Sequence, residues 1–232
     1  MRNVYISNVR INDERAIVPV IYHRAEVGQA LAPEHHIVWS LFGRHDKDRI
    51  WLYRRLTDRA LRVISSKAPS SSPYATVVTT REQNFDWVKT DTRLLFKIRA
   101  NAVKRVVIDG KTRKVDVVMH VLHPLSPQQR SDQREEITRA AYLDWMQRQG
   151  EAHGFTAKPE TFQVVAHYRE RIPRRRAAPI FLNCGELVGM LKVTDPDALR
   201  TCLVEGLGAS RSFGCGLLEV AQVHSAAVAG GA

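Results

Sequence analysis

Residues 93–101 alternate between apolar and polar side chains, which is the pattern of a β-strand with one covered face. Apolar residues occupy every second position and share one side of this stretch: Leu94, Phe96, Ile98 and Ala100. The intervening positions share the other side: Leu95, Lys97, Arg99 and Asn101. The pattern therefore predicts a strand that contributes a single face to a core.

Further short strands are mixed with helices, without a regular βα alternation. Strands are predicted at residues 3–11, 50–55 and 61–66. A helix is predicted from Pro33 to about Phe42, where Gly43 ends it, and residues 68–74 form a loop. This mixture favours the α+β class.

The middle of the chain contains a turn, a linker and a helix start. Asp109-Gly110 predicts a turn between two Val-rich runs. The stretch 124–131, rich in Pro, Ser and Gln, is predicted to be a linker. Asp132 and Glu135 have capping-box spacing, so a helix is expected to follow and to end at Gly150.

The composition is strongly basic. Lys and Arg number 35 against 24 Asp and Glu, which gives a net charge of +11 and a sequence pI near 10.0. This balance indicates a polyanionic partner, nucleic acid ahead of an anionic membrane. The sequence shows no signal-peptide core and no membrane span. Three cysteines lack metal-ligand spacing, and we expect free thiols in a reducing cytoplasm: Cys184, Cys202 and Cys215.

A glycine-rich segment, Gly206–Gly216, follows a helix that is predicted to begin at Asp195. Two Gly-x-Gly units flank a stretch with one arginine, Arg211, and two serines. Glycines let backbone N–H groups approach a phosphate, and the arginine can pair with it. The spacing fits neither a Walker loop nor a dinucleotide fingerprint. A connection needed only for tight packing is equally compatible with the sequence.

A basic run at residues 169–176 holds five arginines and one glutamate between two strand-like stretches. It would project as a hairpin or loop. Arginine pairs with phosphates and with guanine edges, and in A-form RNA such an arm would read shape and backbone. We therefore expect contact with RNA here rather than a solvated turn.

Two adjacent histidines, His35 and His36, lie on the helix predicted from Pro33. His35 falls at the edge of the apolar face of this helix, whereas His36 falls roughly opposite it. A proton-transfer histidine must be held by packing and still be reachable by substrate, so His35 is the better candidate. The alternative is that His35 has only a structural role at the edge of this apolar face. Adjacent helical positions do not suit a shared metal ion.

Three segments together carry a family resemblance. At the start, the strand Tyr5–Val9 precedes the helix His35–Phe42, which has the pattern H-x-x-x-W-x-L-F. In the middle, Phe96–Arg105 is similar to F-x-[LI]-R-A-N-P-x-K, with Ala102 in place of the usual proline. At the end, Gly206–Leu218 matches a terminal glycine loop almost throughout. In this order, and over nearly the whole chain, these motifs resemble the CasE family of CRISPR RNA-processing endoribonucleases.

The resemblance implies tandem ferredoxin-like (RRM-like) modules. The expected division is 1–123 for the first module, 124–131 for the linker, 132–223 for the second module and 224–232 for a frayed tail. It also implies a metal-independent endoribonuclease without a cofactor, which cuts CRISPR precursor RNA at the 3′ base of each repeat hairpin. The 2′-hydroxyl attacks and leaves a 2′,3′-cyclic phosphate and a 5′-hydroxyl. The enzyme then stays on the mature crRNA among the other Cascade subunits.

The family's catalytic histidine aligns with His35, and a shift of one residue would place it on His36. The family often has a tyrosine three residues earlier, where this chain has Ala32, and Tyr22 is our candidate for the second catalytic residue. RNA contacts are expected from the second and third motifs and from the basic run: Arg99, Asn101, Lys104, Arg105, Arg169, Arg171, Arg174, Arg175, Arg176, Gly208, Ser210, Arg211 and Ser212. A Cascade subunit that holds RNA without cutting it is the alternative function.

Overall fold

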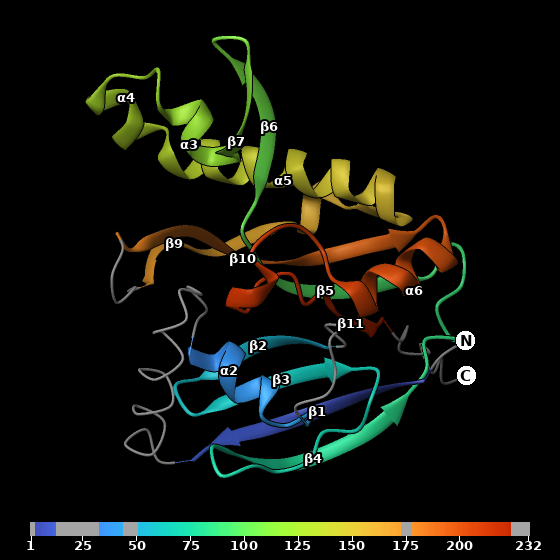
Figure 1. Ribbon diagram of the computed structural model, residues 1–232. Coiled ribbons are helices and arrows are strands. Elements are labelled where there is room, and N and C mark those ends of the chain that lie inside the picture. Colours follow the sequence, from blue (N-terminus) through green and yellow to red (C-terminus); the bar gives the residue numbers. More distant parts are fainter. Residues whose placement is uncertain (1–2, 13–32, 44–50, 173–177, 224–232) are drawn as a thin grey trace, which may run out of the picture.

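The computed structural model describes residues 3–12, 33–43, 51–172 and 178–223, in which two antiparallel sheets stand one above the other (Figure 1). The first sheet contains β1 (Val4–Ile11), β2 (Trp51–Thr57), β3 (Ala60–Ser65) and β4 (Ala75–Gln83). They pair in the order β2-β3-β1-β4, so the last strand lies beside the first. Helix α2 (Pro33–Trp39) buries its apolar side chains against one face of this sheet.

The second sheet repeats this order with β5 (Arg93–Ala100), β8 (Phe155–Ala157), β10 (Ile180–Val193) and β11 (Glu219–Gln222). The strands pair as β11-β5-β10-β8, so the last again lies beside the first. Helix α5 (Arg134–His153) precedes β8, and helix α6 (Pro196–Glu205) precedes β11. Both sheets thus have the ferredoxin-like strand order, which confirms the predicted α+β tandem.

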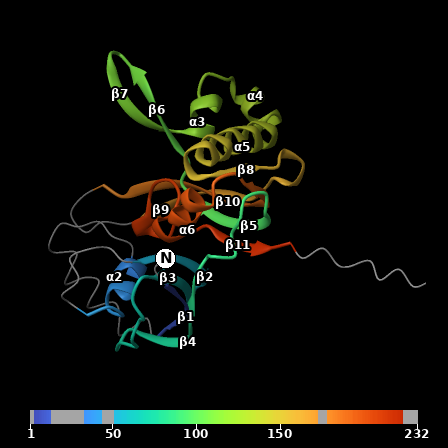
Figure 2. The ribbon, with the colours of Figure 1, turned by 90° about the vertical axis from the view of Figure 1, so that its right-hand side faces the viewer.

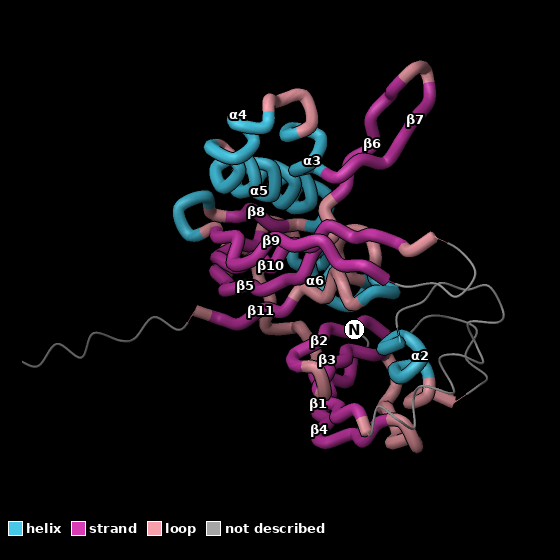
Figure 3. Tube along the Cα trace, turned by 90° about the vertical axis from the view of Figure 1, so that its left-hand side faces the viewer, coloured by secondary structure: helices cyan, strands magenta, loops and turns pink. Residues whose placement is uncertain are grey.

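Several elements are added to the second unit. Strand β9 (Gln163–Ile172) pairs along β10, and two short 3-10 helices follow β8 and α6: η1 (Pro159–Thr161) and η2 (Arg211–Phe213). Between β5 and α5 lie the hairpin β6 (Val103–Ile108) and β7 (Lys111–Asp116), then α3 (Val117–Leu122) and α4 (Pro127–Asp132). The hairpin projects from the body on the side of α5, as Figures 1, 2 and 3 show. Its turn is the predicted Asp109-Gly110, and both residues have positive φ.

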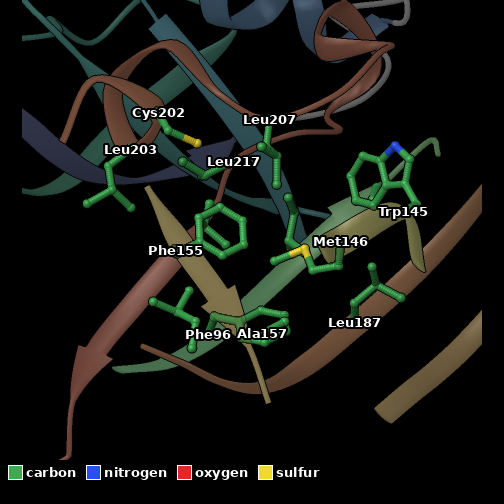
Figure 4. Close-up of a cluster of buried hydrophobic side chains, with 14 of the residues drawn as sticks. Phe96, Trp145, Met146, Phe155, Ala157, Leu187, Cys202, Leu203, Leu207 and Leu217 are labelled. Carbon is green, nitrogen blue, oxygen red and sulfur yellow. The ribbon is translucent and has the colours of Figure 1, made fainter. Parts of the chain in front are cut away.

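The larger core lies between β5, α5 and α6 (Figure 4). Phe96, Met146 of α5 and Leu203 of α6 all belong to this buried cluster. The predicted alternation of residues 93–101 is confirmed, because its apolar face is buried: Leu94, Phe96, Ile98 and Ala100. On the opposite face Leu95 and Lys97 are exposed. Arg99 departs from the pattern and is buried.

A buried arginine joins the two sheets. Arg54 on β2 is 5% exposed, and its guanidinium donates to Glu186 Oε2 at 2.9 Å and to Glu219 Oε2 at 2.7 Å. Arg62 on β3 donates to the other carboxylate oxygen of Glu219, also at 2.7 Å. Glu186 lies on β10 and Glu219 on β11, so this cluster fixes the first sheet against the second.

The observed sheets correct the predicted domain boundary at residue 123. Strand β5 was assigned to the first module, yet it pairs with β10 and β11 in the second sheet. The chain therefore passes from one sheet to the other between β4 and β5. The predicted linker at 124–131 also contains most of α4. The predicted tail at 224–232 lies outside the described residues.

Three helix ends differ from the prediction. The capping box belongs to Ser126 and Gln129 of α4, whereas α5 begins after Gln133 without a side-chain cap. Helix α5 continues past Gly150 to Gly154, which has the left-handed φ of +75° that suits a helix end. Gly150 is needed inside the helix because a Cβ there would lie 2.1 Å from the carbonyl oxygen of Phe155. Helix α2 ends at Trp39 and is followed by a turn.

Replacement of Arg54 by Ala should destabilise the protein by about 3 kcal/mol, since it removes the buried guanidinium that pairs with two carboxylates only 20% exposed, Glu186 and Glu219. Urea unfolding measures this loss. Arg10 on β1 is exposed, and Arg10→Ala should change the unfolding free energy by less than about 0.5 kcal/mol. Equal effects of the two substitutions would contradict the role of Arg54 as the link between the sheets.

Candidate functional site

His35 lies on α2 and is only 6% exposed. Its Nε2 accepts a hydrogen bond from the indole nitrogen of Trp39 at 3.0 Å, and its ring centroid lies 4.8 Å from that of Trp51 on β2. The packing of Trp51 explains why His35 is deeper than the predicted edge position. His36, which was expected in solvent, is half-buried. Because an indole N–H can only donate, Nε2 of His35 carries no proton in this arrangement.

An arginine of β2 pairs with the residue that precedes His35. Glu34, the preceding residue, is buried and forms an ion pair with Arg55 of β2. The Arg55 side chain is 43% exposed, so this guanidinium reaches solvent. A small cleft that Glu34 and Arg55 share with Arg99 and Phe213 connects α2 to the second unit. Sequence reasoning missed Arg55, because nothing in the local pattern of β2 marks it.

The glycine loop, residues 206–218, packs beside α2 and is anchored at both sides. The hydroxyl of Ser210 donates to Asn101 Oδ1 at 2.9 Å, and Asn101 Nδ2 donates to the carbonyl of Asn183 at 2.8 Å. From the first unit, the Tyr53 hydroxyl donates to the Ser212 carbonyl at 3.0 Å. Ser210 itself adopts a left-handed φ of +59°. The loop therefore connects β5 and β10 to the strand that packs against His35.

The structure buries two residues that the sequence predicted to contact RNA, Arg99 and Asn101. Both residues are 7% exposed. Arg99 forms an ion pair with Glu170 on β9, lies over the ring of Tyr168 and approaches the Cys184 thiol. Their polar groups bond within the protein next to the glycine loop, and their contact with RNA remains a prediction.

The three cysteines are free thiols, as predicted, and the structure shows that all three are buried. Cys184 on β10 and Cys215 in the glycine loop have their sulfur atoms 3.8 Å apart. The hydrogen bond from Cys215 lowers the pKa of the Cys184 thiol, and Arg99 contributes in the same direction. Burial raises the pKa of Cys202 to about 12. The pair thus adds a further contact between the loop and the sheet.

The predicted loop residues are mainly engaged within the protein. Arg211 donates to the Glu205 carbonyl at 2.7 Å and to that of Gly208 at 3.3 Å, so it closes the end of α6. A Cβ at Gly208 would lie 2.8 Å from the ring of Trp145. These contacts support the alternative that the glycines of this loop are needed for tight packing. Contact of Gly208, Ser210, Arg211 and Ser212 with RNA remains a prediction.

The β6-β7 hairpin and β9 present exposed basic side chains. Arg105 on β6 is exposed and faces Lys114 of β7, while Lys104 is half-buried. Arg169 and Arg171 are exposed on β9, where the Arg169 guanidinium lies 4.0 Å from the centroid of Phe181. Sequence reasoning missed three hairpin residues: Lys111, Arg113 and Lys114. Their signal was a basic cluster around the Asp109-Gly110 turn.

Tyr22 and Arg174–Arg176 were predicted site residues that lie outside the described residues, as does Ala32. Across residues 3–12, 33–43, 51–172 and 178–223, no cluster of three or more His, Cys, Asp or Glu side chains could hold a metal ion. None of the helices in the same ranges is long and apolar enough to cross a membrane.

These observations define a double ferredoxin-like protein with a packed histidine near the junction of its two sheets and a basic projecting hairpin. A family model described as CRISPR associated protein matches residues 4–222. The chain therefore belongs to this CRISPR-associated family, and the CasE resemblance drawn from its sequence is confirmed.

Individual relatives agree with this placement. The chain is 26% identical over 202 residues to the CRISPR system Cascade subunit CasE of Escherichia coli (strain K12), which covers 82% of this chain and 90% of that protein. Its fold is similar to that of Thermus thermophilus Cse3 bound to an RNA representing a pre-cleavage complex. The TM-score is 0.65 at 21% identity, over 94% of this chain and 99% of the other. Cas6e from Escherichia coli str. K-12 gives a TM-score of 0.65 at 21% identity, with 94% and 100% covered.

Gly208→Ala should destabilise the protein more than Gly110→Ala. Both glycines have positive φ, +79° and +72°, so each substitution introduces backbone strain of about 1 kcal/mol. Only at Gly208 does the new Cβ meet Trp145, which adds an overpacking cost of about 1–3 kcal/mol, whereas Gly110 has open space. Urea unfolding of both variants tests this difference. Equal losses of unfolding free energy would show that the glycine loop accommodates the new Cβ without overpacking.

Proposed function

We propose that the protein is a metal-independent endoribonuclease that cuts CRISPR precursor RNA at the 3′ base of each repeat hairpin. The observation that carries this proposal is His35, a histidine held by Trp39 and Trp51 in a chain that belongs to the CRISPR-associated family. RNA supplies its own nucleophile, the 2′-hydroxyl beside the scissile phosphate. The protein has to align this hydroxyl, move protons and offset the phosphorane charge.

His35 takes the proton of the 2′-hydroxyl in this mechanism. Its Nε2 is unprotonated in the structure but engaged by the Trp39 N–H. RNA binding therefore has to open this hydrogen bond before Nε2 can accept a proton. Arg55 provides positive charge from the adjoining strand, on the solvent side of Glu34. The 2′-oxygen then bonds to phosphorus and displaces the 5′-oxygen, which takes a proton from solvent while His35 returns its own proton to solvent. The products are a 2′,3′-cyclic phosphate and a 5′-hydroxyl.

The basic side chains on the hairpin and β9 hold the repeat RNA. Arg105 and Lys114 face each other across the hairpin, and Arg169 and Arg171 continue the charge along β9. A-form RNA is read mainly through its backbone and shape, which suits arginines and lysines on a projecting arm. The Cse3 relative is bound to an RNA, and the CasE relative is a Cascade subunit. By analogy we propose that this protein stays bound to the mature crRNA within Cascade and that it resides in the cytoplasm.

A subunit that holds crRNA without cutting it is the second candidate. It is favoured by Ala32, which stands where the family often has a tyrosine. Tyr22 would restore a second proton-transfer group in the first candidate. Cleavage by the unaltered protein separates the two candidates, and Tyr22→Phe then tests the second group, because it slows cleavage only if this hydroxyl takes part in the chemistry.

His35→Ala should reduce cleavage of repeat RNA by at least about 100-fold, the lower end of what one acid-base group contributes. Affinity for the RNA hairpin should change by less than about threefold, because the basic β6-β7 hairpin of the protein is unchanged. His36→Ala is the matched control and should retain cleavage. Gel assays of cleavage and binding distinguish the two residues. If His36→Ala were the inactive variant, the alignment would be shifted by one; if neither were inactive, the histidine mechanism would be wrong.

The double substitution Arg105→Ala and Lys114→Ala should weaken binding of the RNA hairpin and make the affinity less dependent on salt. Each lost phosphate contact lowers the log–log slope of affinity against salt by about one, so a loss of about two is expected. Arg148 and Lys192 are side chains partly exposed elsewhere on the second unit, and their double replacement by Ala is the control. The same slope in all three proteins would exclude the β6-β7 hairpin from the RNA interface.

A further inference from the structure

A hollow between α5 and β9 lies apart from His35, on the side of the second sheet from which the basic hairpin projects. Its volume is about 700 Å³, and α5 lines it with Arg134, Thr138 and Arg139. This size falls within the range of about 300–1,000 Å³ that is usual for pockets that bury small molecules. The hollow is open enough to admit part of a polymer as well as a free ligand.

The floor of the hollow is apolar, and its shape depends on an irregularity in β9. Phe162, Val164 and Val165 line it, and Val165 is 65% exposed. The β9-β10 register shifts here, since Glu186 pairs with Ala166 and Leu187 with Val164. Val165 is therefore the extra residue of a β-bulge. Bulges redirect side chains, and here the bulge turns an apolar side chain into an open site.

The rim is basic. Arg134 and Arg139 are exposed, and Arg139 is oriented by donating to the Pro159 carbonyl at 2.5 Å. Glu135 is the acidic residue of the lining. Burial lowers the pKa of His167, with Asp116 opposing the shift and Arg134 adding to it. His167 is therefore neutral near pH 7, so the two arginines supply the positive charge.

One residue that lines the hollow, Thr138, carries a buried hydroxyl without a hydrogen-bond partner in the described part of the chain. Thr138 is 6% exposed, and within the described part of the chain its Oγ1 has no hydrogen-bond partner. Buried polar groups are normally paired, because desolvation is costly when the bond is missing. One turn further along α5, Tyr142 packs its ring against His167 with a centroid distance of 5.8 Å. The wall of the hollow thus offers hydrogen-bonding capacity that the protein itself does not use.

We propose that this hollow binds one unpaired nucleotide of the RNA substrate, outside the base-paired stem. The base lies on the exposed side chain of Val165, the phosphate pairs with Arg134 and Arg139, and Thr138 bonds to a base edge or a 2′-hydroxyl. Only an unstacked base can use such a surface, since A-form stems hide their bases. The inference rests on the proposed function, and it assigns recognition of single-stranded RNA to a second site.

Continuity with the basic strand supports an RNA occupant over a free nucleotide. His167 is followed on the same face of β9 by Arg169 and Arg171, both exposed. A strand of RNA that leaves the stem along these arginines would reach the bulge at Val165 directly. The hollow is therefore an extension of the RNA-holding surface rather than an isolated pocket.

Two RNAs test the proposal: the repeat hairpin alone, and the hairpin with its single-stranded flanks, both with a 2′-deoxy scissile nucleotide that blocks cleavage. Thr138→Val should weaken binding of the flanked RNA about tenfold, the value of one hydrogen bond, and leave the hairpin alone unchanged. Arg134→Ala, at an exposed position that folding does not need, should act in the same way. Arg148→Ala on the same helix is the control and should change neither affinity.

Cross-linking locates the nucleotide. A 4-thiouridine walked through the flanks should cross-link at one position to the peptide that contains residues 162–167. The proposal is overturned if Thr138→Val and Arg134→Ala leave the flanked RNA unaffected, or if the cross-links fall only on other peptides, while cleavage at the hairpin persists. Saturable binding of AMP at this peptide without any flank dependence would also overturn it in favour of a free nucleotide. Failure of the unaltered protein to bind either RNA would instead overturn the proposed function, and this inference with it.

Discussion

The buried guanidinium of Arg54 is the interaction on which the arrangement of the molecule depends. Strand β2 uses its two faces differently. Trp51 and Tyr53 pack with α2 on one face, whereas Leu52 and Arg54 contact the second unit on the other. A single strand therefore holds the histidine-bearing helix and also fixes it against the second sheet. Three charge-assisted hydrogen bonds in the seam give this docking a defined geometry, which apolar contact alone would not.

The basic side chains that we propose hold the RNA lie on the second unit and His35 lies on the first, and Asn101 contributes to the connection between them. It directly precedes the β6-β7 hairpin, bonds to Asn183 on β10 and accepts from Ser210 of the glycine loop. Tyr53 completes the path from this loop to the strand beneath His35. The β6-β7 hairpin, which we propose binds the RNA, and the loop beside the histidine thus share one anchor. This accounts for an Arg-x-Asn motif whose side chains face inward.

Local patterns in the sequence predicted local structure well. The alternation of 93–101, the Asp109-Gly110 turn and the helix capped by Asp195 are all present, because each depends on neighbouring residues. The domain boundary was wrong because the pairing of β5 with β10 joins residues about 90 positions apart, which no local pattern encodes. Arg99 looked like an exposed basic residue for the same reason, since its burial depends on β9 and the glycine loop. His35 was found through its helical position, but its hydrogen bond with Trp39 required the structure.

The central claim is that this fold cuts RNA by activating the RNA's own hydroxyl. Incubation of the unaltered protein with the repeat RNA of its own locus in excess EDTA, followed by end-group mapping of the products, tests it directly. The account predicts a single cut at the 3′ base of the hairpin, which leaves a 2′,3′-cyclic phosphate and a 5′-hydroxyl. A cut that appears only after Mg²⁺ is added, or a product with a 3′-hydroxyl, would contradict it.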